Sequence, residues 1–142
     1  MRLATAKAAA AAVTETDVVL AADTVVALGR RMLGKPRDAA EAEAFLRLLS
    51  GRRHRVVTAI ALRGRDGLRS QVVETAVRFK RMSDHEIAAY LASGEWQGKA
   101  GGYAIQGRAG ALVPWINGSY PNVVGLALAE TVGLLRGLGW RP

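Results

Sequence analysis

The sequence predicts an α/β fold: one domain with a mixed, twisted central sheet and helices on its faces. Segments whose apolar residues alternate with period two are interleaved with segments of helical period, which is typical of α/β domains. Hydrophobic residues make up 50% of the 142 positions, enough for a sizeable core. No internal repeat and no linker rich in Pro, Gly or Ser divides the chain. We therefore assign a single domain to residues 1–142.

The first elements predicted are a helix and two short strands. Leu3–Val13 consists mainly of Ala, Lys and Leu, which are strong helix formers, and it predicts a helix. Val18–Ala22 is a continuous apolar run, which indicates a strand buried on both faces. Such a strand would end at Asp23 and bring its carboxylate to the rim of the sheet. Val25–Leu28 predicts a further strand.

A second helix and a long hairpin follow. Asp38 precedes Glu41 in the spacing of a capping box, and this predicts a helix that begins there. Strict alternation over Val56–Leu62 and again over Val73–Phe79 indicates two strands joined by a turn. We expect them to pair in an antiparallel hairpin with one solvated face.

The last third of the chain predicts two helical regions with short strands between them. A second capping box over Ser83–Glu86 indicates a helix that ends at Gly94. Tyr103–Gln106 and Ala111–Ile116 are read as short strands. Val123–Leu138 predicts a C-terminal helical region with an apolar face.

Composition and charge narrow the function classes. Lys and Arg number 20 against 12 Asp and Glu, so the formal charge of +8 favours an anionic partner. The absence of cysteine excludes disulfides, thiol nucleophiles and cysteine metal sites. No apolar run approaches the roughly 18 residues of a membrane span. We expect a cytoplasmic protein with no membrane partner. His54 and His85 have no carboxylates at ligand spacing, and neither is assigned to a metal.

Three short motifs carry the chemistry. Glycines on both sides of an apolar run in Gly98–Gly107 permit close backbone approach to a ligand, and the lysine and glutamine of that run supply a cation and an amide. In Ala22–Thr24, a carboxylate at a strand end is suited to deprotonating a water or holding a divalent cation. In Gly34–Pro36, proline stiffens the segment that presents the lysine. The structural alternatives are an aspartate that caps a turn and an ordinary surface lysine.

These motifs, followed by Asn117–Leu126, resemble the Maf family of nucleoside triphosphate pyrophosphatases from about Leu3 to Gly137. Ala-Asp-Thr at 22–24 and Ala-Ile-Gln-Gly at 104–107 look like the branch that acts on dTTP and UTP. The resemblance implies a fold like that of Maf and inosine triphosphatase. It also implies hydrolysis of a nucleoside triphosphate between the α and β phosphates, giving a monophosphate and pyrophosphate.

The resemblance also implies roles for individual residues. The matching aspartate is the proposed proton acceptor and a ligand of a divalent cation, Mg²⁺ or Mn²⁺. Two lysines would offset charge on the phosphates, and a threonine and a glutamine would select the base. Apart from the resemblance, two residues that flank the glycine-rich loop are expected from their position to touch substrate or cation. A salt-linked loop pair is the alternative for these last two. Asp23 is the aspartate, and Lys7 and Lys35 are the two lysines. Thr24 and Gln106 are the residues that would select the base, and Glu95 and Lys99 are the two that flank the loop.

The sequence departs from the family at its N-terminus. Family members begin with a strand and a Ser-x-Ser-Pro-Arg-Arg loop and later carry an Asp-Glu pair, and none of these precedes the segment that matches Leu3–Val13. We expect an N-terminally truncated domain whose catalytic competence is open. A catalytically inactive homologue and a basic nucleic-acid-binding module are the alternatives to the enzyme. The expected partner is a nucleoside triphosphate, not nucleic acid, and a homodimer is left open.

Overall fold

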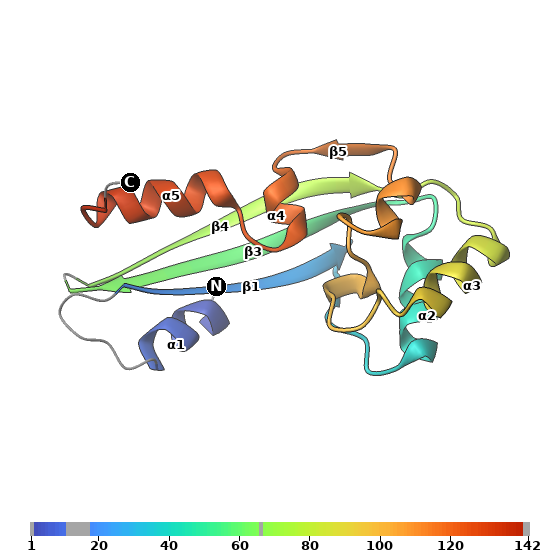
Figure 1. The fold of residues 1–142 in the computed structure, drawn as a ribbon, viewed down its shortest axis with the longest axis horizontal. Helices are drawn as coiled ribbons and strands as arrows, with labels where there is room; N and C mark the ends of the chain where they lie inside the picture. The colour runs from blue at the N-terminus through green and yellow to red at the C-terminus, as the bar shows by residue number, and fades with distance from the viewer. Residues whose placement is uncertain (1, 11–17, 66, 141–142) are drawn as a thin grey trace.

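The computed structural model describes residues 2–10, 18–65 and 67–140. Five strands form one sheet in the order β2-β1-β3-β4-β5 (Figure 1). The strands are β1 (Val19–Leu28), β2 (Arg31–Leu33), β3 (Arg53–Gly64), β4 (Gly67–Arg78) and β5 (Trp115–Asn117). The helices are α1 (Arg2–Ala10), α2 (Ala39–Leu49), α3 (Asp84–Ser93), α4 (Tyr120–Val124) and α5 (Leu128–Gly137), with short 3₁₀ turns η1 (Ala100–Gly102) and η2 (Arg108–Leu112).

The α/β class with a helix-flanked sheet is confirmed, but the expectation of a mixed sheet is corrected. Every strand pair among the described residues is antiparallel. The reason is that β1 lies between β2 and β3. These two strands run in the same direction and are connected through α2, but they do not pair with each other.

The helices cover the sheet unevenly. α1 packs on β1 and β3 from one side, while α4 and α5 lie along β3 and β4 on the other side (Figure 1). α2 and α3 pack against each other at the end of the sheet that holds β2. No helix in the described ranges is long and apolar enough to cross a bilayer.

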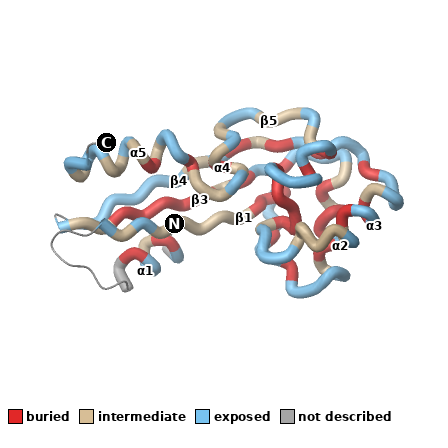
Figure 2. Tube along the Cα trace, in the orientation of Figure 1, coloured by how far each residue is buried: buried red, intermediate tan, exposed pale blue. Residues whose placement is uncertain are grey.

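Two separate cores hold these layers together. The larger core lies where α2 and α3 meet the sheet and includes Phe45, Leu49 and Phe79, and the buried segments gather at that end in Figure 2. The smaller core joins α1 to the sheet through alanines. Ala4 and Ala8 are about one helical turn apart on α1, and Ala59 and Ala61 are two positions apart on β3. Small side chains let the helix approach the strand closely. β3 is therefore buried on both faces along its second half, where a single solvated face was expected.

The predicted caps explain where the helices begin. Asp38 accepts a hydrogen bond from the Glu41 backbone N–H at 2.8 Å. The Glu41 carboxylate, however, accepts from the Arg37 backbone N–H instead of completing the box. Ser83 and Glu86 form a complete capping box, and Gly94 ends α3 in the left-handed region at φ 73°. The 38–49 and 83–94 predictions are confirmed.

Several strand predictions are corrected. The two strands predicted over Val18–Ala22 and Val25–Leu28 form one strand, β1, which begins at Val19, so Asp23 lies in the middle of β1 instead of at a strand end. The expectation of burial on both faces is also wrong for that segment, since Val18 is 45% exposed and Leu20 is 44% exposed. β1 has this open character because the short β2 pairs with it only over Val26–Leu28.

The C-terminal third differs in the same way. Tyr103–Gln106 is a turn after η1, not a strand, and Ala111–Ile116 is strand only from Trp115 onward. The helix expected over Val123–Leu138 is interrupted at Gly125, which separates α4 from α5. At the N-terminus, α1 confirms the predicted helix as far as Ala10, and the rest of that prediction lies outside the described residues.

Candidate active site

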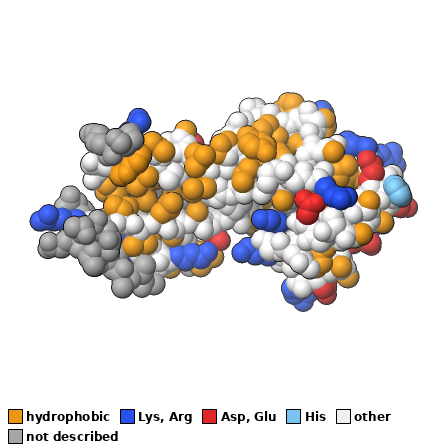
Figure 3. Space-filling view, in the orientation of Figure 1, with side chains coloured by type: hydrophobic (Ala, Val, Ile, Leu, Met, Phe, Trp, Pro, Cys, Tyr) orange, Lys and Arg blue, Asp and Glu red, His pale blue; other side chains and the backbone are white. Residues whose placement is uncertain are grey.

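A cavity of about 200 Å³ lies at the open edge of β1. Three chain segments supply most of its walls: residues 22–26 of β1, the loop at 98–106 and the end of α4 at 123–125. Lys7 from α1 and Lys35 from the loop after β2 complete it. The space-filling view shows the surface hollowed between α1 and the part of the molecule built around α2, with Lys and Arg side chains on both sides of the hollow (Figure 3). The cavity thus brings together six of the seven predicted site residues.

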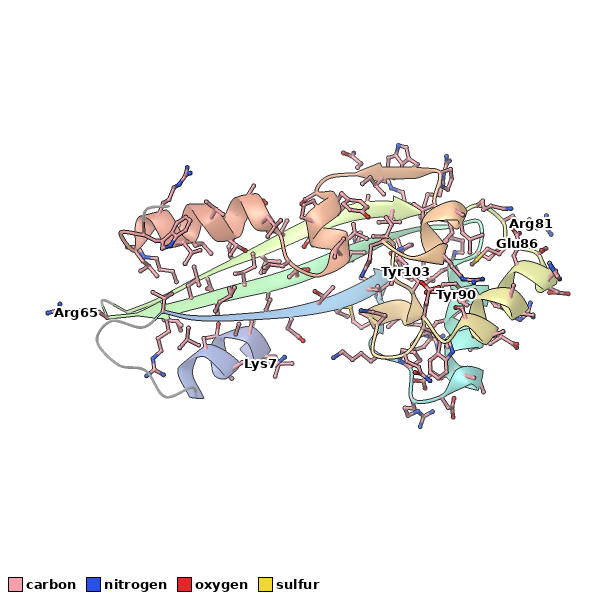
Figure 4. All side chains as sticks on the ribbon, viewed as in Figure 1. Lys7, Arg65, Arg81, Glu86, Tyr90 and Tyr103 are labelled. Atoms are coloured by element: carbon pink, nitrogen blue, oxygen red, sulfur yellow. The ribbon has the colours of Figure 1, made fainter. Side chains whose placement is uncertain are left out.

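Asp23 and Lys7 form an ion pair at the cavity. Their Oδ1 and Nζ atoms are 3.5 Å apart, and their side chains are 38% and 50% exposed. The Lys7 side chain extends from α1 toward the loop that follows α3 (Figure 4). α1 is held in place by Ala4 and Ala8 against the sheet, so the ammonium is delivered to the carboxylate by packing. Substrate can compete for both groups because both reach solvent.

Thr24 faces the opposite side of β1 from Asp23, since adjacent side chains of a strand alternate. Its hydroxyl lies 2.9 Å from that of Thr58 in the paired position on β3. It also lies 3.5 Å from the Gly125 carbonyl oxygen, which it reaches as a donor. At the unpaired edge of β1, both faces open into the same cavity. Neighbouring residues therefore present a carboxylate and a hydroxyl to different parts of one ligand.

The glycine-rich loop is fixed against the segment that carries Lys35. The Gly101 backbone N–H donates to the Gly34 carbonyl at 3.0 Å. Gly101 has φ 69°, and a Cβ there would stand 2.8 Å from Val26 Cγ2. Only glycine combines this conformation with so close an approach. The contact holds Lys35 and Lys99 at the same cavity, with the exposed Gln106 further along the loop.

The structure does not bring Glu95 into the cavity wall. Its carboxylate accepts from the Arg108 backbone N–H at 3.1 Å and pairs with Arg108 Nε at 3.3 Å. Glu95 is therefore half of a loop ion pair, as the alternative reading allowed, with Arg108 and not Lys99 as its partner. Of the two residues predicted beside the loop, the cavity receives Lys99.

Asp23 is the one carboxylate among the described residues that line the cavity. Within the described ranges, no group of three or more His, Cys, Asp or Glu side chains is arranged to hold a metal ion. Mg²⁺ usually keeps several waters and binds through one or two carboxylates together with substrate phosphates. Asp23 could serve as a single protein ligand of that kind, and the remaining oxygens would then have to come from a bound phosphate and water.

Sequence reasoning missed the buried histidine next to the site. His54 is 2% exposed, and its Nε2 lies 2.6 Å from the hydroxyl of Tyr103, a residue that lines the cavity. Burial lowers the pKa of His54 from 6.5 to about 4, so the ring is neutral at pH 7. Burial also raises the pKa of the Tyr103 hydroxyl. His54 stands two positions before Val56 and between two arginines, so the alternation predicted from Val56 onward, extended back by two residues, was a signal that its side chain points inward.

Comparisons with known proteins identify the family of the chain. Residues 1–138 match the family described as Maf-like protein. The chain is 62% identical over 138 residues to the dTTP/UTP pyrophosphatase of Cereibacter sphaeroides, which covers 97% of this chain and 72% of that protein. It is 59% identical over 140 residues to the dTTP/UTP pyrophosphatase of Roseobacter denitrificans, covering 99% and 74%. Because the family match runs through almost all of its length, the chain belongs to the Maf-like protein family.

Proposed function

We propose that this chain is a nucleoside triphosphate pyrophosphatase that hydrolyses dTTP and UTP to the monophosphate and pyrophosphate. The observation that carries the proposal is the single cavity in which one carboxylate, three lysines, a threonine and a glutamine converge. Relatives at 58–62% identity that are named dTTP/UTP pyrophosphatase support the same substrates.

The proposed division of labour follows the two faces of β1. On the α1 side, Asp23 accepts the proton of the attacking water as the bond between the α phosphate and the bridging oxygen breaks. Lys7, Lys35 and Lys99 offset the charge of the phosphates and of the pyrophosphate that leaves. On the α4 side, Thr24 and Gln106 contact the base. Because Lys7 pairs with Asp23 in the free protein, binding of a phosphate to Lys7 would free the carboxylate for its catalytic role.

A divalent cation, Mg²⁺ or Mn²⁺, is part of this proposal. Asp23 would hold it together with phosphate oxygens, and the bound ion would neutralise charge on the triphosphate. The protein must also hold the anhydride in a fixed orientation relative to Asp23. The Lys35 segment, stiffened by Pro36 and tied to Gly101, is suited to that orienting role.

The test is the release of pyrophosphate from UTP and dTTP with Mg²⁺ or Mn²⁺, measured beside the formation of the monophosphate. We expect equal amounts of the two products, and Asp23→Asn should reduce the rate by at least about 10²-fold, because an amide cannot accept the proton. Glu43→Gln is the matched control. This exposed glutamate pairs with Arg47 on α2, away from the cavity, and its loss should leave the rate unchanged.

Two results would contradict the proposal. One is release of inorganic phosphate in place of pyrophosphate, which would mean cleavage at the terminal phosphate. The other is full activity of a folded Asp23→Asn variant, which would remove the carboxylate from the mechanism. Circular dichroism of each variant shows whether it is folded.

The remaining expectations about partners and place are proposals as well. We propose that the chain acts in the cytoplasm and does not depend on nucleic acid. An oligonucleotide that inhibits UTP hydrolysis at low salt but loses this effect steeply with added salt would instead reveal polyanion binding, with a slope of about −0.9 per phosphate contacted. A homodimer remains a prediction for analytical ultracentrifugation.

A further inference from the structure

A buried polar network lies directly behind the α4 side of the cavity. At its centre is Asn122, which is 0% exposed. Its Nδ2 lies within hydrogen-bond distance of three acceptors, and its two hydrogens are shared among them: the Val56 carbonyl at 3.1 Å, the Val73 carbonyl at 3.2 Å and Thr75 Oγ1 at 3.0 Å. One side chain thus holds α4 to both β3 and β4. A buried amide is costly unless it is hydrogen-bonded, so the contacts of Nδ2 hold α4 against the sheet, while the buried Oδ1 has no hydrogen-bond partner among the described residues.

The end of α4 returns from this anchor to the cavity. The Gly125 backbone N–H donates to the Asn122 carbonyl at 3.1 Å and to the Pro121 carbonyl at 3.2 Å. Gly125 has φ 135°, a conformation that L side chains rarely adopt, although a Cβ there would meet nothing within 4 Å. The backbone conformation, and not crowding, therefore requires glycine here. This turn directs the Gly125 carbonyl oxygen toward the Thr24 hydroxyl.

Thr58 connects the buried Asn122 to Thr24 in the cavity wall. It is 0% exposed and does not line the cavity, but its hydroxyl lies 2.9 Å from that of Thr24 and donates to the Asn122 carbonyl at 3.5 Å. A hydroxyl carries one hydrogen, so Thr24 donates either to Gly125 or to Thr58. When Thr58 donates to the Asn122 backbone carbonyl and Thr24 donates to Thr58, the Gly125 carbonyl receives no hydrogen from Thr24, and the lone pairs of both oxygens are available to a ligand. A carbonyl oxygen can only accept hydrogen bonds, and Thr24 is then an acceptor beside it.

A fixed pair of acceptors distinguishes pyrimidines by their ring nitrogen. N3 of uracil and thymine carries a hydrogen and donates, whereas N3 of cytosine has a lone pair that would face the carbonyl without a hydrogen bond. Sites built on such hydrogen bonds reject analogues that leave a polar group unpaired.

We propose that Thr58 and Asn122 are positioning residues that hold the Gly125 carbonyl and the Thr24 hydroxyl as an acceptor pair for the ring N–H of a uracil or thymine base. This inference rests on the proposed function, because it takes the base to lie on the α4 side of the cavity. It assigns a role to the Asn117–Leu126 motif, in which Ser119, Asn122 and Gly125 are tied together. Neither positioning residue needs to touch the nucleotide.

The test compares Thr58→Val with Thr58→Ser. Valine keeps the shape of threonine and removes the hydroxyl, while serine restores it. The probes are UTP and CTP analogues in which a methylene group replaces the α–β bridging oxygen, so binding is measured by calorimetry without hydrolysis. We expect the wild-type chain to prefer the UTP analogue, Thr58→Val to lose about tenfold of that preference, and Thr58→Ser to retain it.

A second variant decides the matter if Thr58→Val does not fold. Ser119→Ala removes the hydroxyl oxygen that accepts from the Asn122 backbone N–H at 3.1 Å, and it should lower the preference for the UTP analogue by about threefold.

Two findings overturn the inference. One is a wild-type chain that shows no preference for the UTP analogue, including one that binds neither analogue. The other is a set of folded variants that keep the full wild-type preference. Pyrophosphate release is measured in parallel. A chain that prefers the UTP analogue but releases no pyrophosphate would refute the proposed function and leave this inference supported.

Discussion

Asp23 and Thr24 show how two adjacent residues can serve different ends of one ligand. Side chains alternate along β1, so the carboxylate meets Lys7 of α1 on one face while the hydroxyl meets Gly125 at the end of α4 on the other. In the interior of a sheet these environments would be separated by the neighbouring strand. At the unpaired edge of β1 they open into one cavity. The residue types could be predicted from the motif, but not this division between faces, because Asp23 was expected at a strand end.

Lys35 should contribute to turnover through its charge and its rigid setting. Lys35→Met removes the ammonium, and we expect kcat/KM for UTP to fall by about 10²-fold. Lys80→Met is the matched control, since Lys80 pairs with Glu86 at the start of α3 and lies outside the cavity. Steady-state kinetics of the two variants makes the comparison. Equal losses would mean that overall charge matters and that the cavity lysine has no special role.

Gln106 should act on selectivity more than on maximal rate. It is exposed at the cavity, where its amide can donate to and accept from a base edge. Gln106→Glu removes the donor, so the preference for UTP over CTP and GTP should shrink while kcat for the best substrate changes little. Specificity constants for UTP, dTTP, CTP and GTP are the measurement, with Gln71→Glu on exposed β4 as control. A uniform fall across all four nucleotides would indicate a structural glutamine.

At the scale of elements, the helices were easier to predict than the short strands. Asp38 and Ser83 mark helix starts through local hydrogen bonds that a sequence pattern encodes directly. Tyr103–Gln106 was read as a strand because it is short and apolar, yet its burial comes from packing of a loop against α3 and the sheet. Such contacts come from distant parts of the chain, and a run of three apolar residues before Gln106 does not reveal them.

The close approach of Gly101 to β1 makes this loop sensitive to a single methyl group. Gly101→Ala would place a Cβ 2.8 Å from Val26 Cγ2 at φ 69°. We expect a loss of about 1–3 kcal/mol in the free energy of unfolding, with weaker UTP binding because Lys99 and Ala100 move with the loop. Urea denaturation and calorimetry measure the two effects.

Gly133→Ala is the control for that substitution. Gly133 lies within α5, and a Cβ there would meet nothing within 4 Å. Alanine should raise stability by up to about 1 kcal/mol, since glycine is a poor helix former. If Gly101→Ala were as stable as the parent chain, the loop could yield without cost, and the argument that Gly101 fixes Lys35 and Lys99 would be wrong.

For the whole molecule, the cavity depends on segments that are far apart in sequence, from Lys7 to Gly125. The resemblance identified the charged and amide groups, which belong to short motifs. It did not identify the network of Thr58, Thr75 and Asn122 that supports the cavity, because a buried polar residue looks like any other until its partners are known. The same limit applied to His54, whose apolar surroundings are assembled from β3, β4 and the loop at Tyr103.

His54 links the stability of the whole domain to pH. Its pKa is about 4 in the folded protein and 6.5 as the ordinary value, so the unfolded chain binds a proton more readily between these values. The stabilisation is complete above about pH 6.5 and is lost as pH falls toward 4. We expect the free energy of unfolding to fall by about 2 kcal/mol between pH 7 and pH 5 from this residue.

His54→Gln keeps a polar partner for Tyr103 but cannot titrate, and it should flatten the pH dependence of the free energy of unfolding in this range. Exposed His85→Gln should leave it intact. Urea denaturation of the three chains at both pH values decides, and an unchanged slope in His54→Gln would show that other groups carry the dependence.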